Sequence, residues 1–223
     1  PLSDTPRPGN AKFKKLTPVD PNSTNPYQLT EADRTVIGNT TPKFSGGFGL
    51  NATYKGFDMS MFFNFMYDFD VLNANKIMLT TWADNKENNF LMDIASDKRW
   101  RNFDDMGNEI RYSPEVLAEF NKNATMWNPT SIGRPICMSY AVEDGSFLRL
   151  NSATLGYTLP SVWTKKVGLS KVRFYVSGNN LFTLTGYSGY DPEVNIATGL
   201  TPNIDYDRYP RSRTYTFGAQ LTF

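Results

Sequence analysis

Hydrophobic and polar residues alternate at a period of two along several short stretches of this chain. In residues 44–54 the even positions, such as Phe48, are apolar, and most odd positions are small or polar. Residues 57–67 repeat the pattern directly after the dipeptide Lys55-Gly56. This period is typical of strands with one apolar face, and a two-residue link that contains glycine predicts a hairpin.

Four more strands are expected elsewhere, the weakest of them near the beginning of the chain. They are predicted at residues 11–16, 146–159, 171–184 and 213–223. Within 146–159 the alternation changes phase, because Leu148 and Leu150 are even whereas Leu155 is odd. A bulge near Asn151-Ser152 would bring both halves onto one face.

The links between these strands differ in length in a regular way. The turn at Lys55-Gly56 and the link 158–170 are short, whereas 17–43, 68–145 and 185–213 are long. Short turns at one end and long loops at the other are typical of transmembrane β-barrels. The longest link contains Ser113-Pro114-Glu115 before an apolar run, which predicts a short helix. A soluble β-sandwich alternates at the same period and stays open as an alternative.

Composition narrows the possible functions. The chain has 223 residues, with 23 Lys plus Arg against 22 Asp plus Glu, so no basic excess exists to bind nucleic acid. It contains no His and only Cys137, which removes imidazole catalysis and an internal disulfide. The mean hydropathy of -0.46 fits a barrel whose lumen and loops are wet. We therefore expect no enzyme activity, no cofactor and no metal. Residues 20–25 lack the glycine turn and the regular acidic spacing of a calcium loop, so no calcium is expected there.

Four stretches, taken together and in order, resemble the SusC/RagA family of TonB-linked outer-membrane transporters. They are Thr35-Val36-Ile37-Gly38 through Ser60, Val142-Glu143-Asp144-Gly145 through Pro160, Val172 through Thr183 with Tyr187 to Asp191-Pro192-Glu193, and Ile204-Asp205 with Tyr209-Pro210-Arg211 and Arg213 to Phe223. Their order and spacing are similar to the C-terminal end of that family.

The resemblance implies an all-β fold: an antiparallel transmembrane β-barrel with long extracellular loops in the cell outer membrane. Residues 1–223 would supply about the last six strands of a roughly 22-stranded barrel, and the plug domain would lie outside them. The protein would import oligosaccharides or peptides. The implied partners are a SusD-like surface lipoprotein, TonB through an N-terminal region, the barrel-assembly machinery and membrane lipid.

Three sets of residues are candidates for contacts. Those expected to face the lumen are Asn51, Thr53, Asp58, Asn64, Arg149, Arg173, Asn179 and Gln220. The expected C-terminal assembly signal is Tyr215, Phe217, Leu221 and Phe223. The loop aromatics that could bind a ligand or partner, or simply pack within the loops, are Trp82, Trp100, Trp127, Tyr187 and Tyr190.

Two other interpretations of the function remain open at this stage. The chain could be a soluble all-β module that binds glycans, or the tail of a barrel captured by the assembly machinery. The apolar rows Met59-Met61-Phe63-Phe65 and Tyr215-Phe217 argue against the soluble module, because both would be exposed to water.

Overall fold

The chain forms two compact units in a computed structural model. The loop unit comprises Pro1–Ile37 and Ala74–Ala141, and the sheet unit comprises Gly38–Asn73 and Val142–Phe223. The structure describes residues 7–19, 21–25, 28–81, 89–95, 97–132, 136–194, 203–206 and 208–223.

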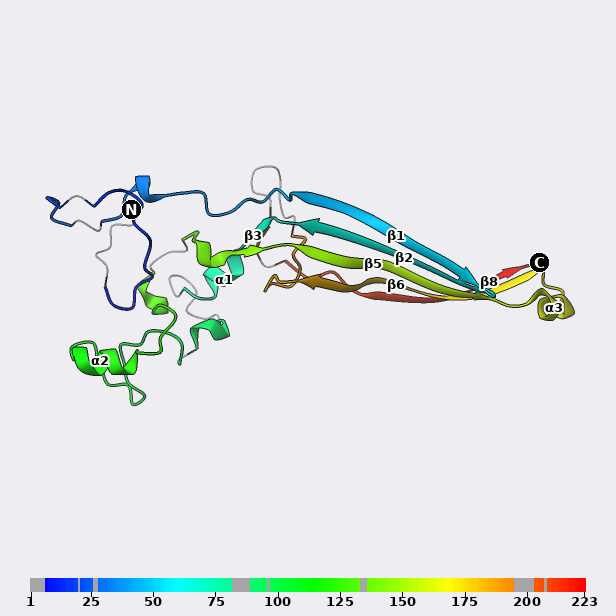
Figure 1. The fold of residues 1–223 in the computed structure, drawn as a ribbon. Coiled ribbons are helices and arrows are strands. Elements are labelled where there is room, and N and C mark those ends of the chain that lie inside the picture. Colours follow the sequence, from blue (N-terminus) through cyan, green and yellow to red (C-terminus); the bar gives the residue numbers. More distant parts are fainter. Residues whose placement is uncertain are drawn as a thin grey trace. The chain divides into compact units, whose positions relative to one another are not determined.

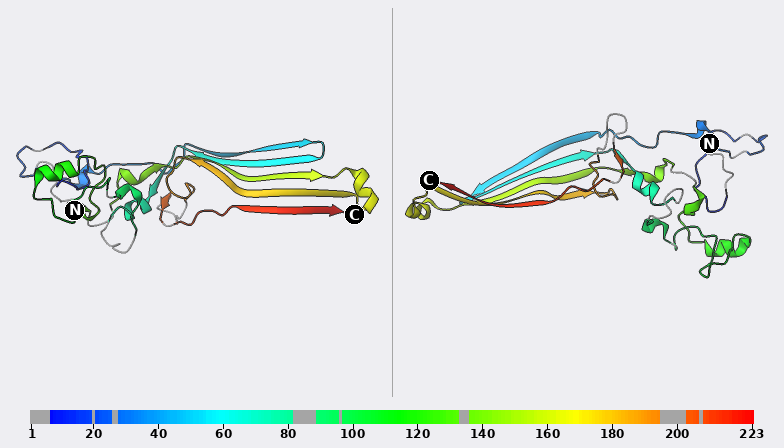
Figure 2. Two further views of the ribbon diagram at one scale, coloured as in Figure 1. Left: turned by 90° about the horizontal axis from the view of Figure 1, so that it is seen from below. Right: turned by 180° about the vertical axis from the view of Figure 1, so that it is seen from behind.

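A five-stranded antiparallel sheet dominates the sheet unit (Figure 1). Its strands, in spatial order, are β1 (Phe44–Tyr54), β2 (Phe57–Tyr67), β5 (Phe147–Thr158), β6 (Lys171–Thr185) and β8 (Thr214–Thr222). The views of Figure 2 show these strands side by side from β1 to β8. Each strand begins and ends within one residue of the expected bounds, so the period-two pattern located all five.

The turn between β1 and β2 has the geometry that its sequence favours. Lys55 and Gly56 have φ values of 45° and 88°. Two successive positive φ values correspond to a type I′ turn, whose twist matches that of the flanking strands. A Cβ on Gly56 would lie 2.8 Å from the carbonyl oxygen of Thr158, so a side chain would also clash with β5.

The predicted bulge in β5 is confirmed. The pairing of β5 with β6 shifts between Leu150 and Ser152, and the pairing with β2 shifts between Phe62 and Phe63. The extra residue returns Leu155 to the face that carries Leu150, which explains the change of phase in the sequence.

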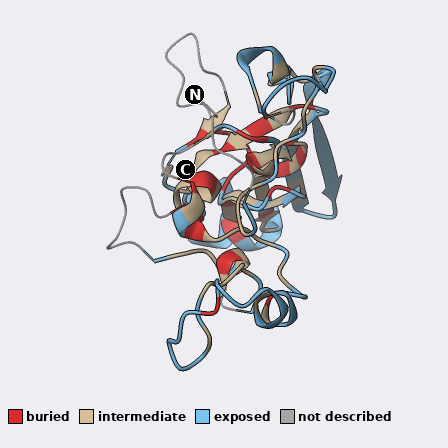
Figure 3. Ribbon diagram, turned by 90° about the vertical axis from the view of Figure 1, so that its left-hand side faces the viewer, coloured by how far each residue is buried: buried red, intermediate tan, exposed pale blue. Residues whose placement is uncertain are grey.

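The register separates the sheet into an apolar face and a polar face. One line across all five strands joins Ala52, Met59, Leu155, Val176 and Phe217. The neighbouring line on the opposite face joins the polar residues Asn51, Ser60, Thr154, Ser177 and Thr216. Leu155 is 48% exposed and Phe217 is 80% exposed, so the apolar face is open. Every residue of the edge strand β1 is exposed as well (Figure 3).

A small second sheet and the core lie beside the β6 end that reaches Thr185. The second sheet has the order β4 (Val142–Asp144), β3 (Asp70–Asn73) and β7 (Ile204–Asp205), and β3 pairs in parallel with β7. The buried core of this region consists of Phe69, Val71, Phe147, Tyr187 and Val194. This core connects the long loop after β6 to the sheet.

The link between β5 and β6 is a short helical turn that contacts the chain end. It contains α3 (Ser161–Thr164) and a 3-10 helix, η5 (Lys165–Val167), and ends at Gly168 with φ of 75°. The Ser170 hydroxyl donates to the carbonyl oxygen of Thr222 at 2.9 Å.

The described residues of the loop unit form short helices and irregular segments. The helices are η1 (Glu31–Asp33), α1 (Ala74–Met78), η2 (Met92–Ile94), α2 (Pro114–Phe120), η3 (Pro129–Ser131) and η4 (Ser139–Ala141). The structure confirms the helix predicted after Ser113, although the Ser113 side chain makes no capping hydrogen bond. Most of α2 is exposed (Figure 3). None of the helices in the described part of the chain has the length and apolar character needed to span a lipid bilayer.

The strand predicted at residues 11–16 is wrong. This segment pairs with no strand among the described residues, and a side chain binds the backbone at its end. The Asp33 carboxylate accepts hydrogen bonds from the N–H groups of Leu16 and Thr17 at 2.9 and 2.8 Å. Alternation alone could not reveal this competing acceptor in the sequence.

Candidate functional site

Arg149 is a buried cation on the polar face of β5. It is 2% exposed and lies in register between Asn64 of β2 and Thr183 of β6. Its guanidinium carbon is 5.4 Å from the centre of the Phe147 ring. A buried guanidinium is costly unless it is paired, so its partners determine whether this end of the sheet is stable.

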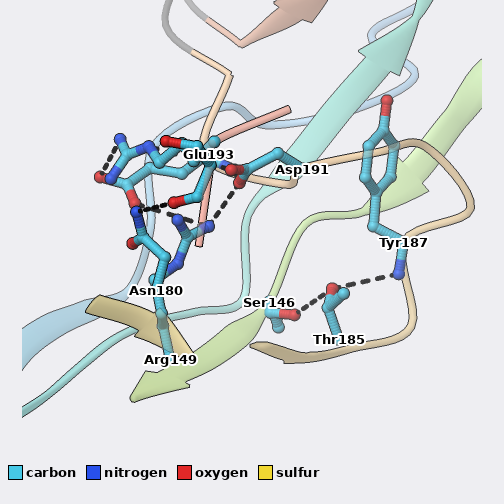
Figure 4. Close-up of polar contacts among 9 residues, drawn as sticks. Ser146, Arg149, Asn180, Thr185, Tyr187, Asp191 and Glu193 are labelled. Carbon is cyan, nitrogen blue, oxygen red and sulfur yellow. Dashed lines mark hydrogen bonds and ion pairs between the residues drawn. The ribbon is translucent and has the colours of Figure 1, made fainter. Parts of the chain in front are cut away.

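The loop after β6 supplies the partners of Arg149 (Figure 4). Arg149 Nη2 donates to Asp191 Oδ1 at 2.5 Å and lies 3.8 Å from Glu193 Oε2. Asp191 Oδ1 also accepts the N–H of Glu193 at 2.9 Å, and the buried Pro192 between them fixes φ. The Asp-Pro-Glu sequence therefore forms a tight turn that directs both carboxylates toward β5.

A second arginine completes this cluster from the segment before β8. Arg211 Nη2 lies 3.1 Å from Glu193 Oε1, and its Nε lies 3.8 Å from Asp191 Oδ2. We name Arg149, Asp191, Glu193 and Arg211 the clamp, because they join β5, the loop after β6 and the segment leading into β8. Its two positive and two negative charges balance.

A pocket of about 240 Å³ lies beside the clamp. It exists because β8 stops pairing with β6 at Asn179, where Thr214 is the last partner. The next residue, Asn180, has φ of 52°, which kinks β6, and its Nδ2 donates to the carbonyl oxygen of Ser212 at 3.1 Å. The chain before Thr214 thus diverges from β6 and leaves a wedge-shaped space between the two segments, which is the pocket. The wedge is lined by Arg149, Asn180, Thr183, Thr185, Tyr190, Asp191, Arg211 and Arg213, with Phe182, Pro192 and Pro210.

Tyr187 packs in the core of the sheet unit, which is the packing alternative left open for the loop aromatics. It is 6% exposed, its hydroxyl donates to Asp205 Oδ2 at 2.6 Å, and its N–H donates to Thr185 Oγ1 at 3.1 Å. The Thr185 hydroxyl in turn donates to the carbonyl oxygen of Ser146 (Figure 4). Burial, followed by the hydrogen bond to Asp205, raises the pKa of Tyr187 above its ordinary value.

The other loop aromatics fall into two groups. Trp127 donates from Nε1 to the carbonyl oxygen of Thr80 at 3.2 Å, and Trp100 packs on Gly9, where a Cβ would lie 2.4 Å from its ring. Both therefore pack within the loop unit. Tyr190 is 82% exposed and lines the pocket. Trp82 lies outside the described residues.

All eight residues expected to face the lumen share the polar face of the sheet. The register places Asn51, Thr53, Asp58, Asn64, Arg149, Arg173, Asn179 and Gln220 on it. Two of them form a bidentate ion pair, in which Arg173 Nε donates to Asp58 Oδ1 at 2.9 Å and Nη2 to Oδ2. This pair lies across Gly156, where a Cβ would be 2.4 Å from the guanidinium.

The predicted assembly residues lie along the apolar face or at its end. Tyr215, Phe217 and Leu221 pair in register with Gly178, Val176 and Val172 of β6. Phe223 follows the end of β8 and is 89% exposed. Their role in assembly remains a prediction.

Arg211, Asp191 and Glu193 are not among the contact residues predicted from the sequence. A signal for them existed: a lone arginine at a strand position, Arg149, requires a carboxylate partner when it is buried. The sequence could not show which carboxylate that would be.

No family model matches the chain, but individual proteins do. TonB-dependent receptor P3 of Formosa agariphila is 35% identical over 202 residues, which is 88% of this chain and 18% of that protein. TonB-dependent receptor SusC of Bacteroides thetaiotaomicron is 36% identical over 88 residues, which is 38% of this chain and 8% of that protein. The chain spans less than a fifth of the length of these curated relatives.

Solved structures with the same fold are those of the RagAB peptide importer. In its closed-closed state the match has a TM-score of 0.64 at 24% identity and covers 88% of this chain and 19% of that chain. In its open-open state the TM-score is 0.62 at 26% identity, again over 88% of this chain. The names of these relatives describe receptors and importers, and none describes an enzyme.

Proposed function

This chain belongs to the SusC/RagA family of TonB-dependent receptors, and we propose that its sheet forms part of the wall of an outer-membrane importer. Such receptors are β-barrel proteins of the outer membrane, and the antiparallel sheet is the corresponding fold. The importer would take up oligosaccharides or peptides, and this chain would contribute no chemical step.

One observation carries the proposal: the sheet has a continuous exposed apolar face backed by a polar face. Apolar residues align across all five strands, with Tyr54 69%, Phe174 51% and Phe217 80% exposed. An apolar surface of this extent is unfavourable in water and favourable against lipid. The same face counts against a soluble glycan-binding module, which would have to cover it.

The two edges of the sheet also support the proposal. β1 and β8 each have a strand neighbour on one side only among the described residues. Unpaired backbone groups within a bilayer cost several kcal/mol each, so further strands must pair there. The rest of a closed barrel would supply them.

Partners follow from this proposal. A SusD-like lipoprotein would sit over the long loops, TonB would act through an N-terminal region, and the assembly machinery would engage Tyr215, Phe217, Leu221 and Phe223. RagAB is described as a peptide importer, whereas the name of SusC specifies no substrate. Co-purification of the full-length receptor with a surface lipoprotein from detergent-solubilised outer membranes would support the first of these partnerships.

A matched pair of labels on β8 tests the proposed wall. Phe217→Cys and Thr216→Cys lie next to each other on opposite faces, and each is made in the full-length receptor carrying Cys137→Ser. A fluorophore at position 217 should be quenched by nitroxide-labelled lipid, and a fluorophore at position 216 should not. Equal quenching at both positions, or full solubility of the receptor without detergent, would contradict the proposal.

A further inference from the structure

The pocket beside the clamp has an excess of positive charge. Three of its lining side chains are arginines, Arg149, Arg211 and Arg213, whereas Asp191 is its one lining carboxylate. Asp191 and Glu193 pair with the first two arginines. Among the described residues, nothing forms a hydrogen bond or ion pair with the side chain of Arg213.

The clamp arginines also retain donors that their carboxylates do not use. A guanidinium has five N–H donors, and Arg149 directs one nitrogen, Nη2, to Asp191. Its Nε is buried and has no hydrogen-bond partner among the described residues. The carboxylates hold both guanidinium groups in place before a ligand arrives, which lowers the entropy lost on binding.

The remaining lining groups match a sugar. Asn180, Thr183 and Thr185 present amide and hydroxyl groups, and the exposed ring of Tyr190 stands at the same pocket. Sugars are bound by hydrogen bonds to their hydroxyls and by packing of a ring face on an aromatic side chain. About 240 Å³ is below the range of 300 to 1,000 Å³ typical of pockets that enclose a drug-sized ligand, so it fits one residue of a longer chain.

We propose that this pocket is a subsite for an acidic sugar residue of an imported oligosaccharide, with the carboxylate of that residue bound by Arg213 and the free donors of the clamp. Arginine suits this role because its planar fork matches a carboxylate. The proposal rests on the importer function and narrows its substrate class. An acidic peptide would present the same carboxylate but would not use the hydroxyl-binding groups.

The test compares probes of one length on the purified full-length receptor. Binding of tetragalacturonate, its methyl ester, tetraglutamate and tetraglutamine is measured by calorimetry in detergent at 0.1 M salt. We expect tetragalacturonate to bind at least tenfold more tightly than the uncharged methyl ester and than tetraglutamate. Preferential binding of tetraglutamate would overturn the sugar assignment, and absence of binding by all acidic probes would overturn the subsite.

A charge-matched pair of variants locates the site. Arg213→Gln removes a pocket cation that is not part of the clamp, and Lys166→Gln removes an exposed cation from the β5–β6 turn at the other end of both strands. Arg213→Gln should weaken tetragalacturonate binding about tenfold or more and leave thermal unfolding unchanged, in line with the loss of a charge-assisted hydrogen bond. Lys166→Gln should change tetragalacturonate binding less than about twofold. Equal effects of both variants would mean that the charge acts from a distance, which would overturn the assignment.

Failure of this subsite can be distinguished from failure of the importer function. The labels at positions 216 and 217 report the barrel wall without any ligand. A lipid-facing label at 217 together with tetragalacturonate binding that Arg213→Gln leaves intact would overturn the subsite alone.

Discussion

The sheet unit and the loop unit satisfy their polar groups in opposite ways. In the sheet, backbone ladders set the positions, and charged side chains such as Asp58 and Arg173 meet because the register aligns their strands. In the loop unit, side chains hold the backbone: Asp33 accepts from three backbone N–H groups, and Asn121 bonds both backbone groups of Arg101. Regular alternation can therefore predict the first unit, whereas the second depends on individual contacts.

The clamp, which lies in the sheet unit, combines both ways of positioning residues. Arg149 is placed by the ladder, but Asp191 and Glu193 are placed by a turn built around Pro192. This is why a strand residue can anchor a long loop.

Asp191→Ala in the full-length receptor should have the largest effect. It leaves the buried guanidinium of Arg149 without its direct partner, which costs about 3–5 kcal/mol for a buried pair. Hydrogen exchange of residues 186–194 should become much faster. Glu115→Ala, an exposed carboxylate on α2, is the control and should leave this exchange unchanged. Wild-type exchange rates in Asp191→Ala would show that the clamp does not hold the loop.

Gly156→Ala tests the sheet wall. Its Cβ would lie 2.4 Å from Arg173 Nη2 and 2.6 Å from Asp58 Oδ1, so the ion pair must shift. We expect a loss of about 1 kcal/mol in the free energy of unfolding, measured in detergent with urea, because both atoms are the far ends of flexible side chains that can shift. Gly186→Ala, where a Cβ meets nothing within 4 Å, is the matched control. Equal stability of both variants would contradict the close approach.

A double-mutant cycle measures the ion pair itself. Asp58→Ala and Arg173→Ala, singly and together, should show only weak coupling, because the two side chains are 34% and 19% exposed and water screens the pair. The same urea unfolding assay applies. A coupling energy as large as the destabilisation caused by Asp191→Ala would contradict the expectation that the Asp58–Arg173 pair is weaker than the clamp.

Asp33 gives the most local effect. Hydrogen bonds from the backbone N–H groups of Thr17 and Thr30, the two largest causes, hold the pKa of Asp33 well below its ordinary value of 3.8. The ionised carboxylate thus stabilises its segment at any pH above 3.8, and the contribution is lost only as the pH falls through the lowered folded-state pKa.

Amide exchange at residues 16, 17 and 30 measures this effect. Protection should persist at pH 3.8 after correction for intrinsic rates, and Asp33→Asn should reduce it at pH 7. Glu31→Gln is the control, because Glu31 is exposed and pairs only with Arg34 among the described residues. Loss of protection in the wild-type protein near pH 4 would contradict the lowered pKa.

Local sequence patterns are enough to predict the five long strands, their faces, the Lys55-Gly56 turn and the bulge near Asn151. Each of these features depends on local alternation or on a residue that accepts a positive φ. Both signals can be recognised within one short segment of the sequence. The wrong prediction of a strand at residues 11–16 shows the limit of local patterns, because Asp33, which binds the backbone of this segment, lies far along the sequence.

The candidate site, in contrast, depends on contacts between distant segments of the chain. The clamp joins residues 149, 191, 193 and 211, and no local pattern specifies which carboxylate reaches a buried arginine. The structure also buries Tyr187 in the core and leaves Tyr190, three residues later, exposed at the pocket. The reason is physical: strand geometry follows from a period of two residues, whereas burial and charge pairing depend on where distant segments meet.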